Sequence, residues 1–122
     1  MNFISIKLMS KLLLSILLFL TGQILIWFQT NGQFLWEWFV KNPLILSVIG
    51  GTTISYTFIL GTKYAVEHFD GLLWPGRFLG FALGISSYAI LTWYFMGEGI
   101  TLKTFTSLIL AVGIICVQLF WK

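Results

Sequence analysis

Residues 74–98, WPGRFLGFALGISSYAILTWYFMGE, decide the fold expected for this chain. The stretch is long and apolar enough for one membrane-crossing helix, which needs roughly 20 mostly apolar residues. Gly76, Gly80 and Gly84 recur at every fourth residue, and Ser87 follows about one turn later on much the same side. Such a stripe of small residues lets another helix backbone approach closely, which is how helices associate in lipid. We interpret the stretch first as a helix-packing surface.

The composition places the whole chain in a membrane. Of its 122 residues 58% are hydrophobic and only 9% are charged, with a mean hydropathy of +0.95. Soluble domains carry about 25% charged residues. A chain of this length has room for about four spans and no separate soluble domain. We therefore expect an integral membrane protein of an inner or plasma membrane.

The apolar runs predict an all-α fold, a single domain with four transmembrane helices. The spans are expected at about residues 8–28, 43–60, 72–96 and 102–121. Lys7 and Lys11 resemble the basic start of a signal peptide, but the first run is longer than a signal core. No small-x-small cleavage site follows it, so we interpret it as a retained first helix.

The connections are expected to be short. Asn31-Gly32 is a strong turn dipeptide, and the aromatic residues around Glu37 are typical of the headgroup region. A short amphipathic helix lying flat and an extension of the first helix both fit this segment. Residues 62–71 are predicted to be a solvated loop, and Gly97 and Glu98 a tight turn.

Metal and redox chemistry have little support. His68 lies between Glu67 and Asp70, but three groups in one short loop without a further histidine make a weak metal site. Cys116 is the sole cysteine, which excludes an intramolecular disulfide. We expect no metal and no cofactor.

The basic residues predict the orientation of the chain. With four spans, the side that holds both termini carries Lys7, Lys11, Lys63, Arg77 and Lys122, and the other side carries Lys41 and Lys103. This bias favours cytoplasmic termini. The net charge of +3 is scattered rather than clustered, so nucleic acid is not an expected partner.

No group of residues supports catalysis, because the spans contain no acid, no histidine and no nucleophile beside a base. The chain is not expected to be an enzyme. Instead, polar side chains gather near the predicted mid-depth of the spans, namely Gln23, Thr52, Thr53, Ser55, Tyr56, Ser86, Ser87 and Tyr88. These side chains could bond neighbouring helices together or line a substrate pathway, and both interpretations stay open.

Further residues are assigned to packing and to the interfaces. Ser47 and Gly51 form a small-residue face on the second span, which we expect to join Gly76, Gly80 and Gly84 as the helix-packing interface. Arg77 either extends to the headgroups and sets topology or holds a lipid phosphate or an anionic substrate. Glu98 is a turn acid near the start of the fourth span, where the helix dipole favours a carboxylate.

The end of the chain resembles a known family. Its features are an aromatic-rich helix end from Ser86, then Gly97-Glu98, then Ile100-Thr101-Leu102-Lys103, and an apolar helix with Gly113 that closes on Gln118-Leu119-Phe120. This pattern resembles the closing helix pair of the drug/metabolite transporter superfamily. Four spans in so short a chain resemble its small multidrug resistance branch.

The resemblance implies a dimer whose two four-helix subunits enclose a pathway and export cationic or amphipathic compounds in exchange for protons. The coupling residue of that family is a glutamate in the first helix. This chain has no acid in its first helix, where Gln23 is the nearest polar substitute. The charge bias also departs from members that insert in both orientations, and it favours a parallel homodimer or another membrane protein as partner.

We therefore expect a transporter-like protein that moves a small cationic or amphipathic molecule across the membrane without the usual proton coupling. The alternative is a structural or accessory subunit of a larger membrane complex. In both cases the lipid bilayer surrounds the chain, and a homodimer or a partner protein is expected, with the glycine stripe of the third span as the interface.

Overall fold

The computed structural model describes residues 3–121, and the side chains of residues 6–121. The long helices are α1 (Phe3–Asn31), α4 (Gly51–His68), α5 (Trp74–Leu91) and α6 (Leu102–Phe120). The short ones are the 3-10 turn η1 (Gly32–Phe34), α2 (Glu37–Lys41) and α3 (Pro43–Ile45), and two π-helical segments are η2 (Leu46–Gly50) and η3 (Thr92–Met96). The described residues contain no β-strand.

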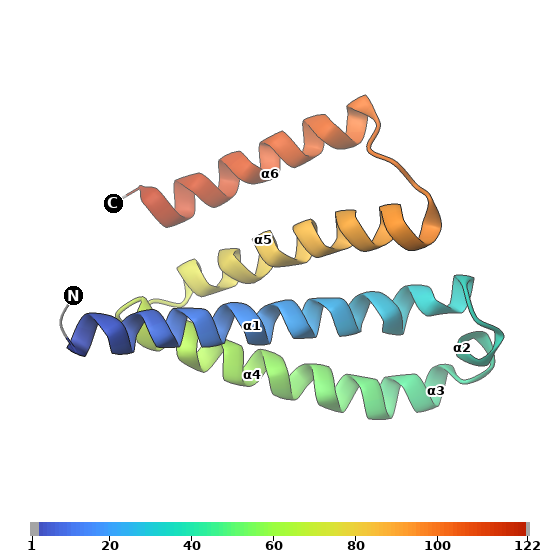
Figure 1. Cartoon of the computed structure of the whole chain (residues 1–122), viewed down its shortest axis with the longest axis horizontal. Helices are drawn as coiled ribbons and strands as arrows, with labels where there is room; N and C mark the ends of the chain where they lie inside the picture. Colours follow the sequence, from blue (N-terminus) through green and yellow to red (C-terminus); the bar gives the residue numbers. More distant parts are fainter. Residues whose placement is uncertain (1–2, 122) are drawn as a thin grey trace.

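Four helical runs are long and apolar enough to cross a membrane. They are Ile6–Phe34, Pro43–His68, Trp74–Met96 and Leu102–Phe120. The predicted all-helical fold with four helices long and apolar enough to cross a membrane is therefore confirmed for the described residues. The start of α1 and the end of α6 lie at the same end of the molecule (Figure 1), which we call the terminal end. Lys122, one of the basic residues used to predict orientation, lies outside the described residues.

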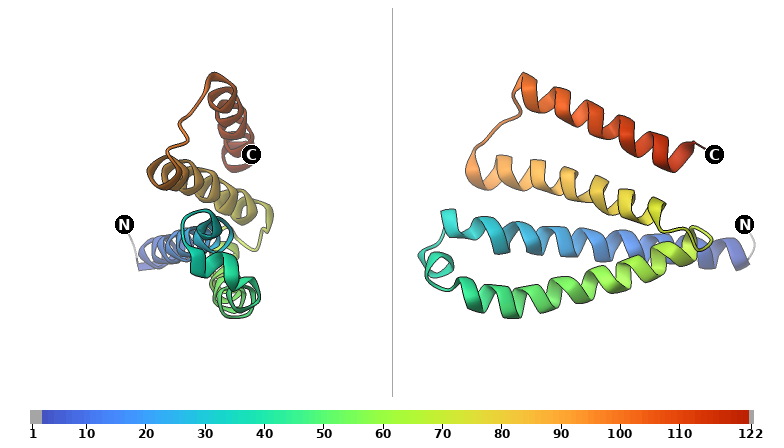
Figure 2. Two further views of the ribbon diagram at one scale, coloured as in Figure 1. Left: turned by 90° about the vertical axis from the view of Figure 1, so that its right-hand side faces the viewer. Right: turned by 180° about the vertical axis from the view of Figure 1, so that it is seen from behind.

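Helix α1 is the central helix of the chain. It packs against both α4 and α5, whereas α6 packs mainly against α5. Both views of the ribbon place α1 between α4 and α5 with α6 beyond α5 (Figures 1 and 2). The first three spans thus form a compact unit, and no residue of α6 is buried.

The side chains that fix α1 in place follow one helical face. Ser15, Phe19 and Trp27 are buried at intervals of four and eight residues, as expected for a period of 3.6 residues per turn. The ring of Phe19 lies between two glycines of neighbouring helices. A Cβ atom at Gly61 of α4 would lie 3.0 Å from this ring, and one at Gly80 of α5 would lie 3.9 Å from it. The absence of side chains at these glycines lets the helices approach closely.

The glycine stripe of α5 is covered by the same chain. A Cβ atom at Gly76 would lie 3.0 Å from Cβ of Ala65 in α4, and one at Gly84 would lie 2.8 Å from the side chain of Gln23 in α1. Gly76 and Gly80 are buried. The stripe is a packing surface within the chain, where α1 and α4 contact it, and its predicted role as an interface with another molecule stays a prediction.

The second predicted packing face is less used. Ser47 is exposed and its hydroxyl donates to the Pro43 carbonyl of its own helix. Gly51 is half-buried, and a Cβ atom there would meet the Gln29 amide at 3.8 Å. The contact between α1 and α4 is closer further along, where a Cβ atom at Gly22 would lie 2.9 Å from Oγ1 of Thr57.

Residues 62–68 are helical, which corrects the prediction of a loop from 62 to 71. Helix α4 continues to His68, and the chain reverses only at Asp70 and Gly71, whose φ angles are 56° and 86°. The extra turns attach α4 to α1 at the terminal end. Lys11 Nζ lies 3.2 Å from a Glu67 carboxylate oxygen, and His68 Nδ1 lies 2.8 Å from the Leu8 carbonyl oxygen.

At the opposite end, side chains of α1 contact both π-helical segments. Trp27 Nε1 donates to Oγ1 of Thr92, the first residue of η3, at 3.0 Å. Gln29 Nε2 donates to the carbonyl of Leu46, the first residue of η2, also at 3.0 Å. At this end, therefore, α1 is bonded to both neighbouring spans, whereas the polar contacts at the terminal end join it to α4.

The two short connections at this end differ from each other. Trp36 is extended, with φ of −130° and ψ of 134°, so α2 is a separate short helix and not an extension of α1. The other connection contains Gly97, with φ of 68°, and the exposed Glu98. Thr101, rather than Glu98, caps α6, because its side chain accepts a hydrogen bond from the Thr104 N–H at 3.3 Å.

Adding a side chain at Gly61 should destabilise the packed unit. Gly61→Leu would press against the buried Phe19 ring, and overpacking typically costs about 1–3 kcal/mol. Gly113→Leu is the matched control, because a Cβ atom at Gly113 of α6 meets nothing within 4 Å. Unfolding in mixed detergent micelles, followed by circular dichroism, measures the difference. Equal stability of the two variants would contradict the packing of α1 on α4.

Candidate functional site

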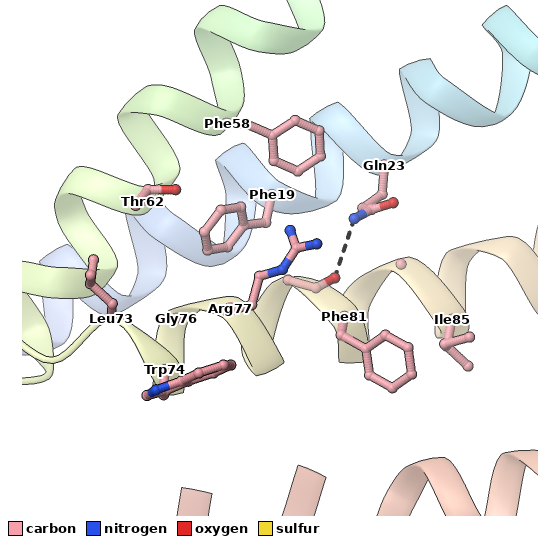
Figure 3. Close-up of a pocket in the computed structure, with 12 residues that line it drawn as sticks. Phe19, Gln23, Phe58, Thr62, Leu73, Trp74, Gly76, Arg77, Phe81 and Ile85 are labelled. Atoms are coloured by element: carbon pink, nitrogen blue, oxygen red, sulfur yellow. Dashed lines mark hydrogen bonds between the residues drawn. The ribbon is translucent and has the colours of Figure 1, made fainter. Parts of the chain in front are cut away.

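A cavity of about 850 Å³ lies along α5 where it faces α1 and α4 (Figure 3). We call it the α5 groove. Helix α1 contributes Phe19 and Gln23 to its lining, and α4 contributes Phe58 and Thr62. The remaining lining residues are Leu73, Trp74, Gly76, Arg77, Gly80, Phe81, Gly84 and Ile85. Most of the wall is apolar.

The glycine stripe gives the groove its space. Gly76, Gly80 and Gly84 all lie in its lining, and they have no side chains that could fill it. Helix α1 covers this stripe mainly through Phe19 and Gln23. Because these glycines have no side chains, neighbouring helices pack closely on α5 at some positions along its axis and leave the cavity open at others.

Gln23 supplies a fixed polar group to the groove. Its Nε2 donates to the Gly80 carbonyl at 3.3 Å, as the dashed line in Figure 3 marks. The amide lies directly over Gly84, within 2.8–2.9 Å of the position that a Cβ atom there would take. Gln23 is thus held against α5 near the middle of the span, and its amide oxygen is not used by this hydrogen bond.

Arg77 supplies the charge of the groove. It is the fourth residue of α5, and in Figure 3 its guanidinium points away from Trp74 toward Gln23. The ion pairs found among the described side chains join Lys11 to Glu67 and Lys41 to Glu37, so neither involves Arg77. None of the residues that line the groove is acidic.

The hydroxyl residues predicted for α4 do not line this groove. Thr52, Thr53, Ser55 and Tyr56 are all exposed. The hydroxyls of Thr52 and Thr53 donate to carbonyls of their own helix, at 2.6 and 3.0 Å. Thr62, further along the same helix, is the α4 hydroxyl that reaches the groove.

The hydroxyl residues predicted for α5 also lie outside the lining. Ser86 and Tyr88 are exposed, and the Ser86 hydroxyl donates to the Ala82 carbonyl at 2.8 Å. Ser87 is buried and donates to the Gly84 carbonyl at 3.1 Å. Because α1 lies between α4 and α5 at mid-depth, the structure does not join the two sets into one polar patch. Gln23 is the member of the predicted pathway that lines the groove.

The sequence did not single out most of the groove lining. Phe19 lies one turn before Gln23 on the same helical face, and Thr62 directly follows the close-packed Gly61. Phe19 could have been predicted from its position one turn from Gln23, and Thr62 from its position next to Gly61. Phe58 and Phe81 carry no comparable signal, because phenylalanine is common throughout this chain.

The groove can hold an amphipathic molecule. Ligand sites are typically concave, largely apolar and about 300–1,000 Å³, with a few placed polar groups. The α5 groove offers one guanidinium, one amide and the Thr62 hydroxyl within an aromatic and aliphatic wall. Among the described residues, no cluster of three or more histidine, cysteine or acidic side chains could hold a metal ion.

Comparison with protein-family models, with curated proteins and with solved structures finds no match for the chain. The resemblance to the small multidrug resistance branch stays a prediction from the closing helix pair, the length and the four expected spans.

Gly84→Ala should destabilise the contact between α1 and α5. The added methyl group would overlap the Gln23 amide, which would have to move and would lose its hydrogen bond to Gly80, at a cost of about 1–3 kcal/mol. Gly113→Ala serves as the control, since that position is open. A Gln23→Ala change in the same chain should recover part of the loss, which a double-mutant cycle of unfolding measures. Strict additivity of the two changes would show that Gln23 does not lie on Gly84.

Proposed function

We propose that the chain binds a small amphipathic molecule in the α5 groove and passes it across the membrane. The observation that carries this proposal is the groove itself, an apolar cavity of about 850 Å³ that contains Arg77 and Gln23. A site with an apolar wall and a few placed polar groups suits a molecule that has both an apolar body and a polar head.

The groove spans about half of the membrane. Its lining runs along α5 from Trp74 to Ile85, which is roughly 16 Å at a rise of about 1.5 Å per residue. The hydrocarbon core is about 30 Å thick. The groove therefore supplies a path from the terminal end to mid-depth. Completing the path requires a second arrangement of the helices or a second subunit, as the similarity to small multidrug resistance proteins would provide.

The charge of the groove argues against a cationic substrate, which that similarity implies. A lining with one guanidinium and no carboxylate repels a cation. The lining also holds no acid or histidine that could exchange a proton. We therefore propose facilitated movement of a neutral or anionic amphiphile that needs no proton gradient. The terminal end is proposed to be cytoplasmic because Lys7, Lys11, Lys63 and Arg77 gather there.

Helix α6 offers a partner a surface other than the glycine stripe. Helix α6 packs mainly on α5 and has no buried residue, so its outer side is open to lipid or to another helix. A homodimer through this side would place two α5 grooves in one assembly. The same observation favours the second candidate function, an accessory subunit that attaches to a larger membrane complex through α6.

Flux measurements in liposomes test the transport proposal. Purified protein should accelerate the movement of an uncharged amphipathic dye between the leaflets or into the lumen, equally with and without a pH gradient. Thr62→Trp should reduce this flux about tenfold or more, because the indole would fill the groove that Thr62 lines. Thr53→Trp, an equally large change at an exposed α4 position outside the groove, should leave it unchanged.

Two outcomes would contradict the proposal. Absence of flux above protein-free liposomes for both uncharged and anionic dyes would reject transport and favour the accessory-subunit function. Flux that depends strongly on a pH gradient would show that a titrating group outside the groove couples it, with Glu37 and Glu98 the first residues to change.

A further inference from the structure

We infer that the ligand of the α5 groove is a lipid amphiphile with an anionic head, either a carboxylate or a phosphate ester. Arg77 binds the head, and the tail lies along α5 toward Ile85. The inference rests on the groove that the proposed function uses, and it adds the charge of the ligand, its orientation and its route of entry.

The direction of the Arg77 side chain is the first observation. An arginine near the end of a span normally extends its charged group toward the headgroups, because a charge in hydrocarbon is costly. Arg77 lies about 4.5 Å along the axis from Trp74, so this route is short. The guanidinium instead points away from Trp74 and into the groove, toward Gln23 (Figure 3). A group at that place favours an anion as its neighbour.

Among the described side chains, no acidic residue forms an ion pair with Arg77. Glu67, an acid of the adjacent α4 end, is paired with Lys11 at 3.2 Å. No acidic residue lines the groove. A guanidinium presents parallel N–H donors that match a carboxylate or a phosphate group, and such paired hydrogen bonds are among the stronger ones in proteins. The head of the ligand is therefore assigned an anionic group.

The wall beyond Arg77 fits a hydrocarbon chain. From Arg77 to Ile85 the groove extends along α5 for about 12 Å, past the glycine positions Gly80 and Gly84 and the rings of Phe58 and Phe81. Gln23 is the other polar side chain on this path, and its Nε2 is already engaged with the Gly80 carbonyl. An apolar path of this length, in a cavity of about 850 Å³, accommodates an acyl chain.

The route of entry follows from the packing of α4 and α5. These two helices meet near their connecting turn, where Gly76 faces Ala65, and α1 separates them further along (Figure 2). The groove is lined by both helices with α1 as its floor, so its open side faces the lipid. An amphiphile already dissolved in one leaflet can enter sideways, with its head staying at the level of Arg77 near the interface.

Binding measurements with the full-length protein in an uncharged detergent test the inference. The probes are dodecyl phosphate, dodecyltrimethylammonium as the cationic counterpart with the same tail, and inorganic phosphate without a tail. Wild-type protein should bind dodecyl phosphate at least about tenfold more tightly than the cationic probe. Inorganic phosphate should not compete at comparable concentrations, because the tail contributes to binding through the apolar wall.

Variants assign the head and the tail separately. Arg77→Gln should weaken dodecyl phosphate binding about 10–100-fold, as expected for loss of a hydrogen-bonded charge pair. Arg77→Lys should restore part of the affinity, and Lys63→Gln, a charge change at the same end outside the groove, should have no effect. Thr62→Trp should also abolish binding while Arg77 is kept. Helical content and melting temperature of each variant show that it is folded.

Three results would overturn the inference. They are equal binding of the anionic and cationic probes, unchanged binding by Arg77→Gln, and competition by inorganic phosphate as strong as that by dodecyl phosphate, which would make Arg77 a site for a free anion. Failure of the proposed function is separate. Flux of an uncharged dye that is blocked by Thr62→Trp, together with equal binding of the anionic and cationic probes, would retain transport and reject the anionic ligand. Tight binding of dodecyl phosphate without any flux would retain the ligand and reject transport.

Discussion

The contact of α1 with the glycines of α4 and α5 is the constraint on which the rest of the structure depends. In lipid, burying apolar side chains brings little advantage over leaving them against acyl chains, so helices associate through close van der Waals packing and hydrogen bonds. Phe19 meets this requirement by lying between Gly61 and Gly80. Gln23 adds a hydrogen bond to the same face of α5. A side chain at Gly61 would press against the Phe19 ring at 3.0 Å, whereas a Cβ atom at Gly80 would make an ordinary contact at 3.9 Å.

This packing also creates the groove. A glycine stripe that is fully covered by a matching helix leaves no space, but α1 covers the α5 stripe with only a ring and an amide. The uncovered part of the stripe forms a hollow, and Arg77 places a positive charge at one end of it. The feature that stabilises the three-helix unit is thus the same feature that provides a binding site, which is why substitutions at the glycines and at Thr62 separate the two roles.

The architecture could be predicted from the sequence to a large extent, because span length, hydropathy and the spacing of small residues are local properties. The helical end of α4 was missed, since the polar residues 62–68 were interpreted as a loop although Gly71 is the first residue that favours a left-handed backbone. The location of the site was harder to predict. The depth of a residue in the membrane follows from its position along the helix. Whether Thr53 or Ser86 faces another helix depends instead on how the helices are arranged. No local sequence pattern indicates that α1 is the central helix. Thr101 as the cap of α6 is a further local feature that the sequence contained.

Disulfide cross-linking in native membranes tests most directly whether the glycine stripe is occupied within one chain. Ala65→Cys and Gly76→Cys would be introduced together in a Cys116→Ala background. The Cβ atoms of this pair lie about 3.0 Å apart when built on the structure, close to the roughly 3.5–4.5 Å of natural disulfides. Mild oxidation should join the two cysteines within one chain, which keeps the mobility of a single chain on a denaturing gel and protects both thiols from labelling. Cross-linking of Gly76→Cys alone into a two-chain species at comparable yield would show that the stripe faces a second molecule, and it would contradict the arrangement of α1, α4 and α5 described above.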